Sequence, residues 1–192
     1  IRDRAIMMSY IGDQTGVYKA MDKLGSASVK DIAKAAEVNE RYLLEWLSSN
    51  AGRGYVTYHD DRDEFSLTPE QAAVFARESE PTCIQGLVQG VVGQFVKEDV
   101  AVEVFKTGRG RPWGEHHECC FCGTERFFRP AYAGHLLDEW IPAMEGVEDK
   151  LKAGAKVADI GCGLGTSSML MAEQYPNLSL IHISEPTRHL DI

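Results

Sequence analysis

Apolar residues at helical spacing dominate the first part of the chain. Between Met7 and Leu24 they recur every three or four positions, although Gly12 and Gly16 interrupt the pattern. Gly25 then follows as a stop signal. The spacing predicts a helical segment that ends at Gly25.

The next stretch, SVKDIAKAAEVNERYLLEWLSSN, predicts two helices joined by a short turn. Ser28, followed three residues later by Asp31, resembles a capping box, and Asn39 is placed to cap the second helix. The apolar positions of the two helices are Ile32, Ala33 and Ala36, then Leu43, Trp46 and Leu47. This arrangement is typical of a helix-turn-helix.

Two short strands and another helix follow in GYVTYHDDRDEFSLTPEQAAVF. The polar run from His59 to Glu64 separates two strand candidates, and Thr68 with Pro69 opens a helix. The pattern therefore predicts a winged-helix domain over residues 1–80.

A winged helix raises the question of DNA binding, and the charges argue against it. Residues 1–80 contain ten Lys or Arg and fourteen Asp or Glu, a balance of −4. The second helix offers Glu40 and Glu45 against Arg41, and the wing turn HDDRDE is acidic, whereas phosphate contacts need basic side chains. We therefore expect this domain to mediate dimerisation or to cover a substrate, without a nucleic-acid partner.

The segment PTCIQGLVQGVVGQFV, from residue 81 to 96, carries no charge and predicts a buried helix. It is too short and too rich in Gln and Gly for a membrane span, which needs about 20 apolar residues. Gly86, Gly90 and Gly93 would allow another helix to approach closely. A dimer interface, a pocket floor and plain core packing all suit such a helix.

Residues 111–140, RPWGEHHECCFCGTERFFRPAYAGHLLDEW, concentrate histidines, cysteines and aromatic residues. Adjacent residues seldom reach one tetrahedral ion, so we predict no metal site at His116, His117, Cys119, Cys120 and Cys122. The simplest interpretation is a loop and a short helix that pack aromatic residues over the next domain: Trp113, Phe121, Phe127 and Phe128. Alternatively, Arg129 and Tyr132 line a ligand pocket at the entrance to a helix that runs through Trp140.

The most informative motif is KVADIGCGLGTSSMLMAEQYPN, which begins at Lys156. VADI predicts a short strand, GCGLG at residues 161–165 a tight turn, and residues 166–174 a helix. This order is that of the first unit of a doubly wound fold. In such a unit, glycines let the backbone touch a ligand at the carboxyl end of the strand.

Asp159, two residues before the first glycine, indicates which ligand suits this turn. Nicotinamide and flavin fingerprints run G-x-G-x-x-G, whereas here the third glycine comes one position early and Thr166 holds the expected place. An Asp at the strand end would repel a pyrophosphate. It suits a ligand with an ammonium, a sulfonium and no phosphate, such as S-adenosylmethionine. The alternative is an ordinary strand, turn and helix with a solvated Asp.

Composition agrees with a globular protein and narrows the ligand. With 192 residues, of which 44% are hydrophobic and 26% charged, the chain is long enough for one domain and part of another. The net charge of −9 favours a neutral or cationic small ligand over nucleic acid. Five cysteines, three of them crowded in ECCFC, favour a reducing cytoplasm over a disulfide framework.

The stretch ADIGCGLGTSS resembles motif I of class I S-adenosylmethionine-dependent methyltransferases. Together with the winged helix, FFRPAY and DEWIPAMEGVEDKLKAGAKVADIGCG resemble the branch of that family with an N-terminal winged-helix domain, over residues 9–177. The resemblance implies that Gly161, Gly163 and Gly165 bind the methyl donor through backbone contacts and that Asp159 lies near its ammonium group. It also implies dimerisation through the winged-helix domain and a small-molecule acceptor.

The last fifteen residues, 178–192, give two conflicting signals. Leu178 and Leu180 begin an alternating run that suggests a second parallel strand, and Glu185 follows near the place where that family holds the ribose with an acid. However, LSLIHISEPTR resembles, in all eleven residues, the translation of a common transposase-based sequencing adapter. We therefore expect residues 178–192 to be a non-native tail and Glu185 to belong to no evolved site.

These features predict a mixed fold. A mostly α winged-helix domain (residues 1–80) is followed by a helical connector with a pocket-lining segment (81–150) and by the first strand-turn-helix unit of a truncated α/β Rossmann-like methyltransferase domain (151–177). The expected activity is methyl transfer to an unidentified acceptor by a cytoplasmic, homodimeric full-length protein, with this fragment inactive alone. A DNA-binding regulator and a non-enzymatic ligand sensor are the alternatives.

Overall fold

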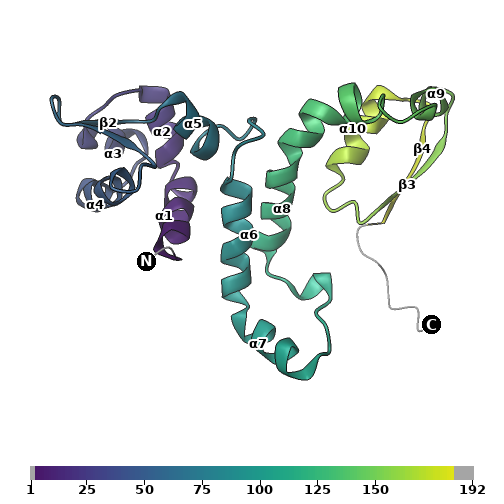
Figure 1. Ribbon diagram of the computed structural model, residues 1–192, viewed down its shortest axis with the longest axis horizontal. Helices are drawn as coiled ribbons and strands as arrows, with labels where there is room; N and C mark the ends of the chain where they lie inside the picture. The colour runs from purple at the N-terminus through teal and green to yellow at the C-terminus, as the bar shows by residue number, and fades with distance from the viewer. Residues whose placement is uncertain (1–2, 184–192) are drawn as a thin grey trace.

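A computed structural model describes residues 3–183 (Figure 1). In chain order the elements are α1 (Asp3–Gln14), α2 (Val17–Leu24), α3 (Val29–Ala35), α4 (Glu40–Ala51), β1 (Thr57–His59), β2 (Glu64–Ser66), α5 (Pro69–Phe75), α6 (Gln85–Val96), α7 (Glu98–Thr107), η1 (Trp113–Glu115), α8 (Glu118–Ala131), η2 (Tyr132–Trp140), α9 (Val147–Lys152), β3 (Lys156–Ile160), α10 (Thr166–Gln174) and β4 (Ser179–Ile183). In Figure 1 the winged-helix domain and the β3–β4 unit lie on opposite sides of a central helix pair, α6 and α8.

The helices of the winged-helix domain begin and end at the predicted signals. Gly16, in the left-handed conformation at φ 71°, divides the predicted first helical segment into α1 and α2, and Gly25 caps α2. The side chain of Ser28 accepts a hydrogen bond from the amide of Asp31, at 3.2 Å. In the same way Asn39 accepts one from the amide of Tyr42, at 3.1 Å. These contacts confirm both predicted caps of the helix-turn-helix.

The wing is an antiparallel hairpin in which Tyr58 lies opposite Phe65. Ala27 forms an additional bridge to Phe65, which attaches the hairpin to the turn before α3. Helix α5 starts with a reciprocal capping box. Gln71 donates its amide to the Thr68 hydroxyl at 3.2 Å, and the Thr68 amide donates to the Gln71 side chain at 2.8 Å. The predicted strands and the predicted helix start are therefore confirmed.

One apolar core holds this domain together. Its centre is formed by Tyr18, Met21, Ile32 and Leu47, each at most 1% exposed. Tyr18 stacks on Phe75 and meets the edge of Trp46, with ring centroids 5.0 Å apart in both pairs. Burial raises the pKa of the Tyr18 hydroxyl to about 12. The core therefore uses the predicted inward face of both helices of the helix-turn-helix.

Helices α6 and α8 cross at glycines. A Cβ atom on Gly86 would lie 2.6 Å from the carbonyl oxygen of Gly123, and one on Gly123 would lie 2.5 Å from the carbonyl oxygen of Gly86. The sequence predicted this close approach from α6 but not Gly123, its partner on α8. The prediction that α6 is buried holds for one face only, because Leu87 and Phe95 are 52% and 63% exposed.

We expect Gly123→Ala to destabilise the protein by about 1–3 kcal/mol, because the backbones of α6 and α8 would have to separate. Gly134→Ala is the matched control, since a Cβ there meets no atom within 4 Å. Ala also favours the helix over Gly by up to about 1 kcal/mol at both positions. Urea unfolding followed by circular dichroism measures the difference, and equal unfolding midpoints for the two variants would contradict the packing described.

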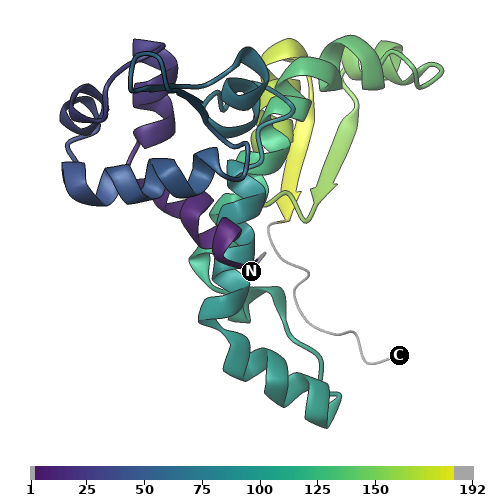
Figure 2. The ribbon, with the colours of Figure 1, turned by 60° about the vertical axis from the view of Figure 1, so that its left-hand side comes forward.

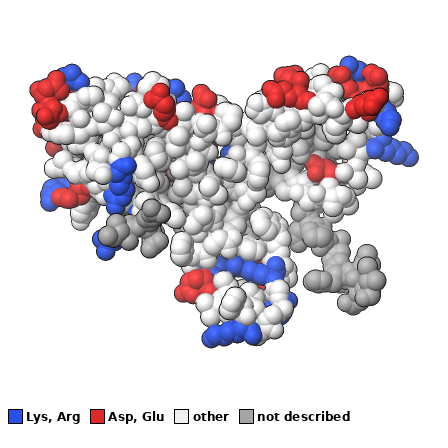
Figure 3. Space-filling view, viewed as in Figure 1, with Lys and Arg blue, Asp and Glu red and all other residues white. Residues whose placement is uncertain are grey.

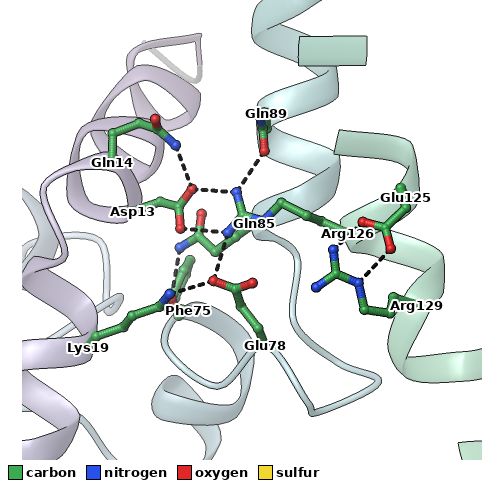
Figure 4. Close-up of polar contacts among 10 residues, drawn as sticks. All are labelled: Asp13, Gln14, Lys19, Phe75, Glu78, Gln85, Gln89, Glu125, Arg126 and Arg129. Carbon is green, nitrogen blue, oxygen red and sulfur yellow. Dashed lines mark hydrogen bonds and ion pairs between the residues drawn. The ribbon is translucent and has the colours of Figure 1, made fainter. Parts of the chain in front are cut away.

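A partly buried ionic cluster joins α8 to the winged-helix domain (Figure 4). The guanidinium of Arg126 donates to both carboxylate oxygens of Asp13, at 2.9 Å each. It also donates to Glu78 at 3.1 Å and to Gln89 at 2.7 Å. The side chains of Arg126 and Asp13 are 16% and 6% exposed, and the hydrogen bonds to Asp13 raise the pKa of Arg126. Helix α8 is therefore fixed to α1 and α6.

Beyond Ala131 the helix widens into the π-helical segment η2. Pro130 lies inside α8 and has no amide hydrogen, which removes one α-helical hydrogen bond just before this change. The helix that was predicted to reach Trp140 is confirmed. The predicted short helix before it is wrong, because α8 starts at Glu118 and runs directly into η2.

The C-terminal part is a strand, a turn and a helix, as predicted, with β4 paired in parallel to β3. A second small core of Ile141, Leu151 and Tyr175 covers one face of this sheet. On the other side Ile160 and Ile181 are 65% and 60% exposed. Figure 2 shows the two strands lying side by side.

Strand β4 lies within the segment expected to be non-native. Its pairing does not test that expectation, because an open strand edge offers hydrogen-bonding groups to any alternating apolar run. Glu185 lies outside the described residues. Within residues 3–183, no helix has both the length and the apolar character to cross a membrane.

Candidate ligand-binding site

A cavity of about 550 Å³ lies between the glycine turn and α8. One wall is formed by the end of β3, the turn and the start of α10. The other wall is formed by α8, the first residue of η2 and Trp113. The residues that line it are Trp113, Phe121, Thr124, Glu125, Phe128, Tyr132, Asp159, Ile160, Gly161, Cys162, Gly163, Leu164, Thr166 and Ser167.

Gly161 and Gly163 of the glycine turn line this cavity, whereas Gly165 does not. Gly161, Gly163 and Gly165 have φ values of 74°, 56° and 81°. This left-handed conformation is rarely adopted by residues with branched side chains. A Cβ built on any of the three would meet no atom within 4 Å, so the space beside the backbone is open. The predicted role of the glycines, to let backbone approach a ligand, is compatible with this geometry.

Asp159 lies at the end of β3 and is half-buried at the edge of the cavity. Its carboxylate accepts hydrogen bonds from Ser167 at 2.9 Å and from Ser168 at 2.6 Å. Ser168 is completely buried. Both donors belong to the first turn of α10, where the positive end of the helix dipole also stabilises an anion. The protein therefore holds a carboxylate in a fixed position beside the glycine turn.

A second carboxylate, Glu125 on α8, lies in the same cavity. It accepts a hydrogen bond from the Thr166 hydroxyl at 3.0 Å and forms an ion pair with Arg129, with 2.6 Å from Nε to Oε1. Hydrogen bonds from Arg129 lower the pKa of Glu125. The position of Glu125 in the cavity was not predicted from the sequence. Its spacing of four residues from Arg129 signals an ion pair, but no sequence pattern shows that α8 brings it to Thr166.

Of the two residues predicted to line a pocket at the entrance to the helix that reaches Trp140, Tyr132 lines the cavity and Arg129 does not. The guanidinium of Arg129 turns to Glu125 instead and is half-exposed. The aromatic residues predicted to pack over the next domain include Trp113, Phe121 and Phe128, which all face the glycine turn across the cavity. Trp113 meets Phe121 edge to face, with ring centroids 5.3 Å apart.

The cluster of histidines and cysteines has structural roles. His117 caps α8 by accepting a hydrogen bond from the amide of Cys119, at 3.2 Å. Cys120 is buried where Gly93 of α6 crosses α8. All five cysteines are free thiols. Within residues 3–183, no three His, Cys, Asp or Glu side chains come together in a way that would hold a metal ion.

Comparison with known proteins places the N-terminal domain in a described class. Residues 3–77 match the model of the Rv2258c-like winged HTH domain. These residues cover α1–α5 and the wing, so the predicted winged helix is confirmed. No curated protein sequence matches the chain.

Several solved structures share the fold of nearly the whole chain. A putative O-methyltransferase from Nostoc punctiforme superposes with a TM-score of 0.63 at 15% identity, over 94% of this chain and 53% of its own length. PigF, solved with SAH, gives 0.61 at 16% identity, with 93% and 55% coverage. Human N-acetylserotonin methyltransferase, in complex with SAM, gives 0.60 at 12%, with 93% and 55% coverage.

The chain therefore spans about half the length of these solved structures. At such identities the likeness shows the fold. The predicted fold class is confirmed: a winged-helix domain and a helical connector precede the first unit of a Rossmann-like methyltransferase fold.

Proposed function

We propose that the full-length protein transfers a methyl group from S-adenosylmethionine to a small-molecule acceptor. The observation that carries this proposal is the cavity in which Asp159 and the glycine turn face the aromatic wall of α8. The fold shared with solved methyltransferases, two of them holding SAM or SAH, supports it.

The residues of the cavity suit the methyl donor by charge and by shape. Asp159 and Glu125 are acidic, and among the described residues that line the cavity there is no Lys or Arg. Such a lining disfavours the phosphates of a dinucleotide and favours a ligand with an ammonium and a sulfonium. The open space beside Gly161 and Gly163 leaves room for direct contact between ligand and backbone.

Each part of the cavity then has a specific role. Asp159 would hold the donor's ammonium, and the backbone of the turn would contact the methionine part. The ring of Tyr132, with Phe128, would exclude water from the reacting groups. The bound donor supplies an electrophilic methyl group, and the protein accelerates transfer mainly by holding donor and acceptor in line.

We also propose that this chain is the N-terminal part of a longer enzyme and is inactive alone. The 65% exposed Ile160 at the end of β3 supports this, because the strands of parallel sheets are normally covered on both faces. The adenosine-binding residues, the catalytic residues and the choice of O, N or C acceptor would then belong to downstream sequence. Sequencing the gene around codon 178 tests the proposal. The proposal fails if the nucleotides that encode LSLIHISEPTR are not those of the sequencing adapter.

The winged-helix domain is proposed to mediate homodimerisation. An apolar groove of about 420 Å³ between α1 and α4, lined by Ile11 and by the 78% exposed Tyr42, supports this role. DNA binding lacks comparable support, because the positive charge of Arg41 on the exposed side of α4 is already paired with Glu45. On the face shown in Figure 3, acidic and basic side chains are mixed over this domain and form no basic patch.

Calorimetric titration of S-adenosylmethionine tests the proposed function. We expect binding by the full-length protein and weak or no binding by the 192-residue chain, which would lack partners for ribose and adenine. In the full-length protein, Asp159→Asn should weaken binding by about 1–3 kcal/mol, because a charge-assisted contact is lost while the side chain keeps its size. Failure of the full-length protein to bind would refute the proposal.

A further inference from the structure

We infer that Glu125 is a positioning residue for the glycine turn. Oriented by Arg129, its carboxylate holds Thr166 and thereby keeps the glycine turn in place against the aromatic wall of α8. The inference rests on the proposed function, because it concerns the same cavity.

The orientation of Glu125 is fixed by its contacts. Oε1 accepts from Nε of Arg129 at 2.6 Å and from the Thr166 hydroxyl at 3.0 Å, and the other oxygen accepts from Nη2 of Arg129. The Glu125 side chain is only 12% exposed. A carboxylate bound in this two-pronged way has little freedom to rotate. Thr166 is therefore held at one position relative to α8.

The first turn of α10 is held from two sides. Thr166 binds Glu125 on α8, whereas Ser167 and Ser168 bind Asp159 at the end of β3. The glycine turn lies between Asp159 and Thr166 in the chain, so the contacts of Asp159 close the turn and the contact of Glu125 joins its α10 end to α8. Loss of the contact to Glu125 would leave the turn attached to β3 without this hydrogen bond to α8.

Helix α8 is itself a fixed reference. The next residue, Arg126, points to the opposite side and binds Asp13 and Glu78 of the winged-helix domain, as Figure 4 shows. Glu125 and Arg126, which are adjacent in α8, therefore connect the glycine turn to the winged-helix domain. Phe128 and Tyr132, which follow on the same helical stretch, line the cavity. This connection, together with the packing of α10 on η2, sets the distance between the aromatic wall and the glycine turn.

Hydrogen exchange on the 192-residue chain tests the contact without a ligand. Thr166→Val removes the hydroxyl but keeps the shape, and Thr166→Ser keeps the hydroxyl. We expect amides of residues 161–169 to exchange about tenfold faster in Thr166→Val, because local opening loses a hydrogen bond to a charged acceptor. Thr166→Ser should match the unchanged chain. Equal exchange in Val and Ser variants would overturn the inference.

Affinity for S-adenosylhomocysteine in the full-length protein gives the second readout. Thr166→Val and Glu125→Gln should each weaken binding about tenfold, and Thr166→Ser should stay within about twofold of the unchanged protein. If the unchanged protein binds and Thr166→Val binds equally well, this inference fails and the proposed function stands. If the unchanged protein does not bind, the proposed function fails and the inference fails with it.

Discussion

Replacing Asp13 by Ala should lower the free energy of unfolding by about 3–5 kcal/mol. Asp13 is 6% exposed and supplies two of the hydrogen bonds to the guanidinium of Arg126. Without it, a largely buried positive charge would keep only Glu78 and Gln89 among the partners that the described residues provide. Urea unfolding of the 192-residue chain measures the loss.

Two further variants distinguish two causes of the lost stability: a guanidinium left without Asp13, and disturbance of the cluster in general. Lys19 belongs to the same cluster through Glu78 but is 58% exposed, so Lys19→Ala should cost less than about 1 kcal/mol. Adding Arg126→Met to Asp13→Ala should restore part of the stability, because the guanidinium that lost Asp13 is then no longer buried. A loss below about 0.5 kcal/mol in Asp13→Ala would mean that the cluster is not buried in solution.

Replacing Gly163 by Val should abolish binding of S-adenosylmethionine by the full-length protein, with affinity reduced at least about a hundredfold. At φ 56° a β-branched residue is strained, and its side chain would occupy the open space beside the turn where the proposed ligand meets backbone. Calorimetry on the purified variant measures the effect.

Gly146→Val is the matched control for backbone strain. Gly146 has φ 68°, precedes α9 and does not line the cavity. The same substitution there should lower stability similarly and leave the affinity unchanged. If both variants bind normally, the glycine turn is not the ligand site.

The parts of the fold that the sequence predicted are those governed by local chemistry. At Ser28, Asn39 and Thr68 the capping side chain accepts a hydrogen bond from the amide three residues later. A short sequence pattern is therefore enough to predict each cap. The strand, turn and helix around Asp159 are local in the same sense. The glycine turn therefore lies between β3 and α10 as predicted.

The contacts that the sequence did not predict join residues far apart in the chain. Arg126 meets Asp13 across 113 positions, and Glu125 meets Thr166 across 41. Both depend on the path of α8, which the close approach of Gly123 to α6 sets. Arg129 was expected to face the ligand but turns to Glu125, because a carboxylate one helical turn away is a nearer partner. Glu125 was therefore missed, whereas Tyr132 on the same side of the cavity was predicted.

A crystal structure of the full-length protein with S-adenosylhomocysteine tests the central claim most directly. We expect the ligand in the cavity between α8 and the glycine turn, with its ammonium within hydrogen-bond distance of the Asp159 carboxylate and its methionine part against the backbone of residues 161–164. A ligand bound elsewhere, or one whose ammonium lies away from Asp159, would contradict it.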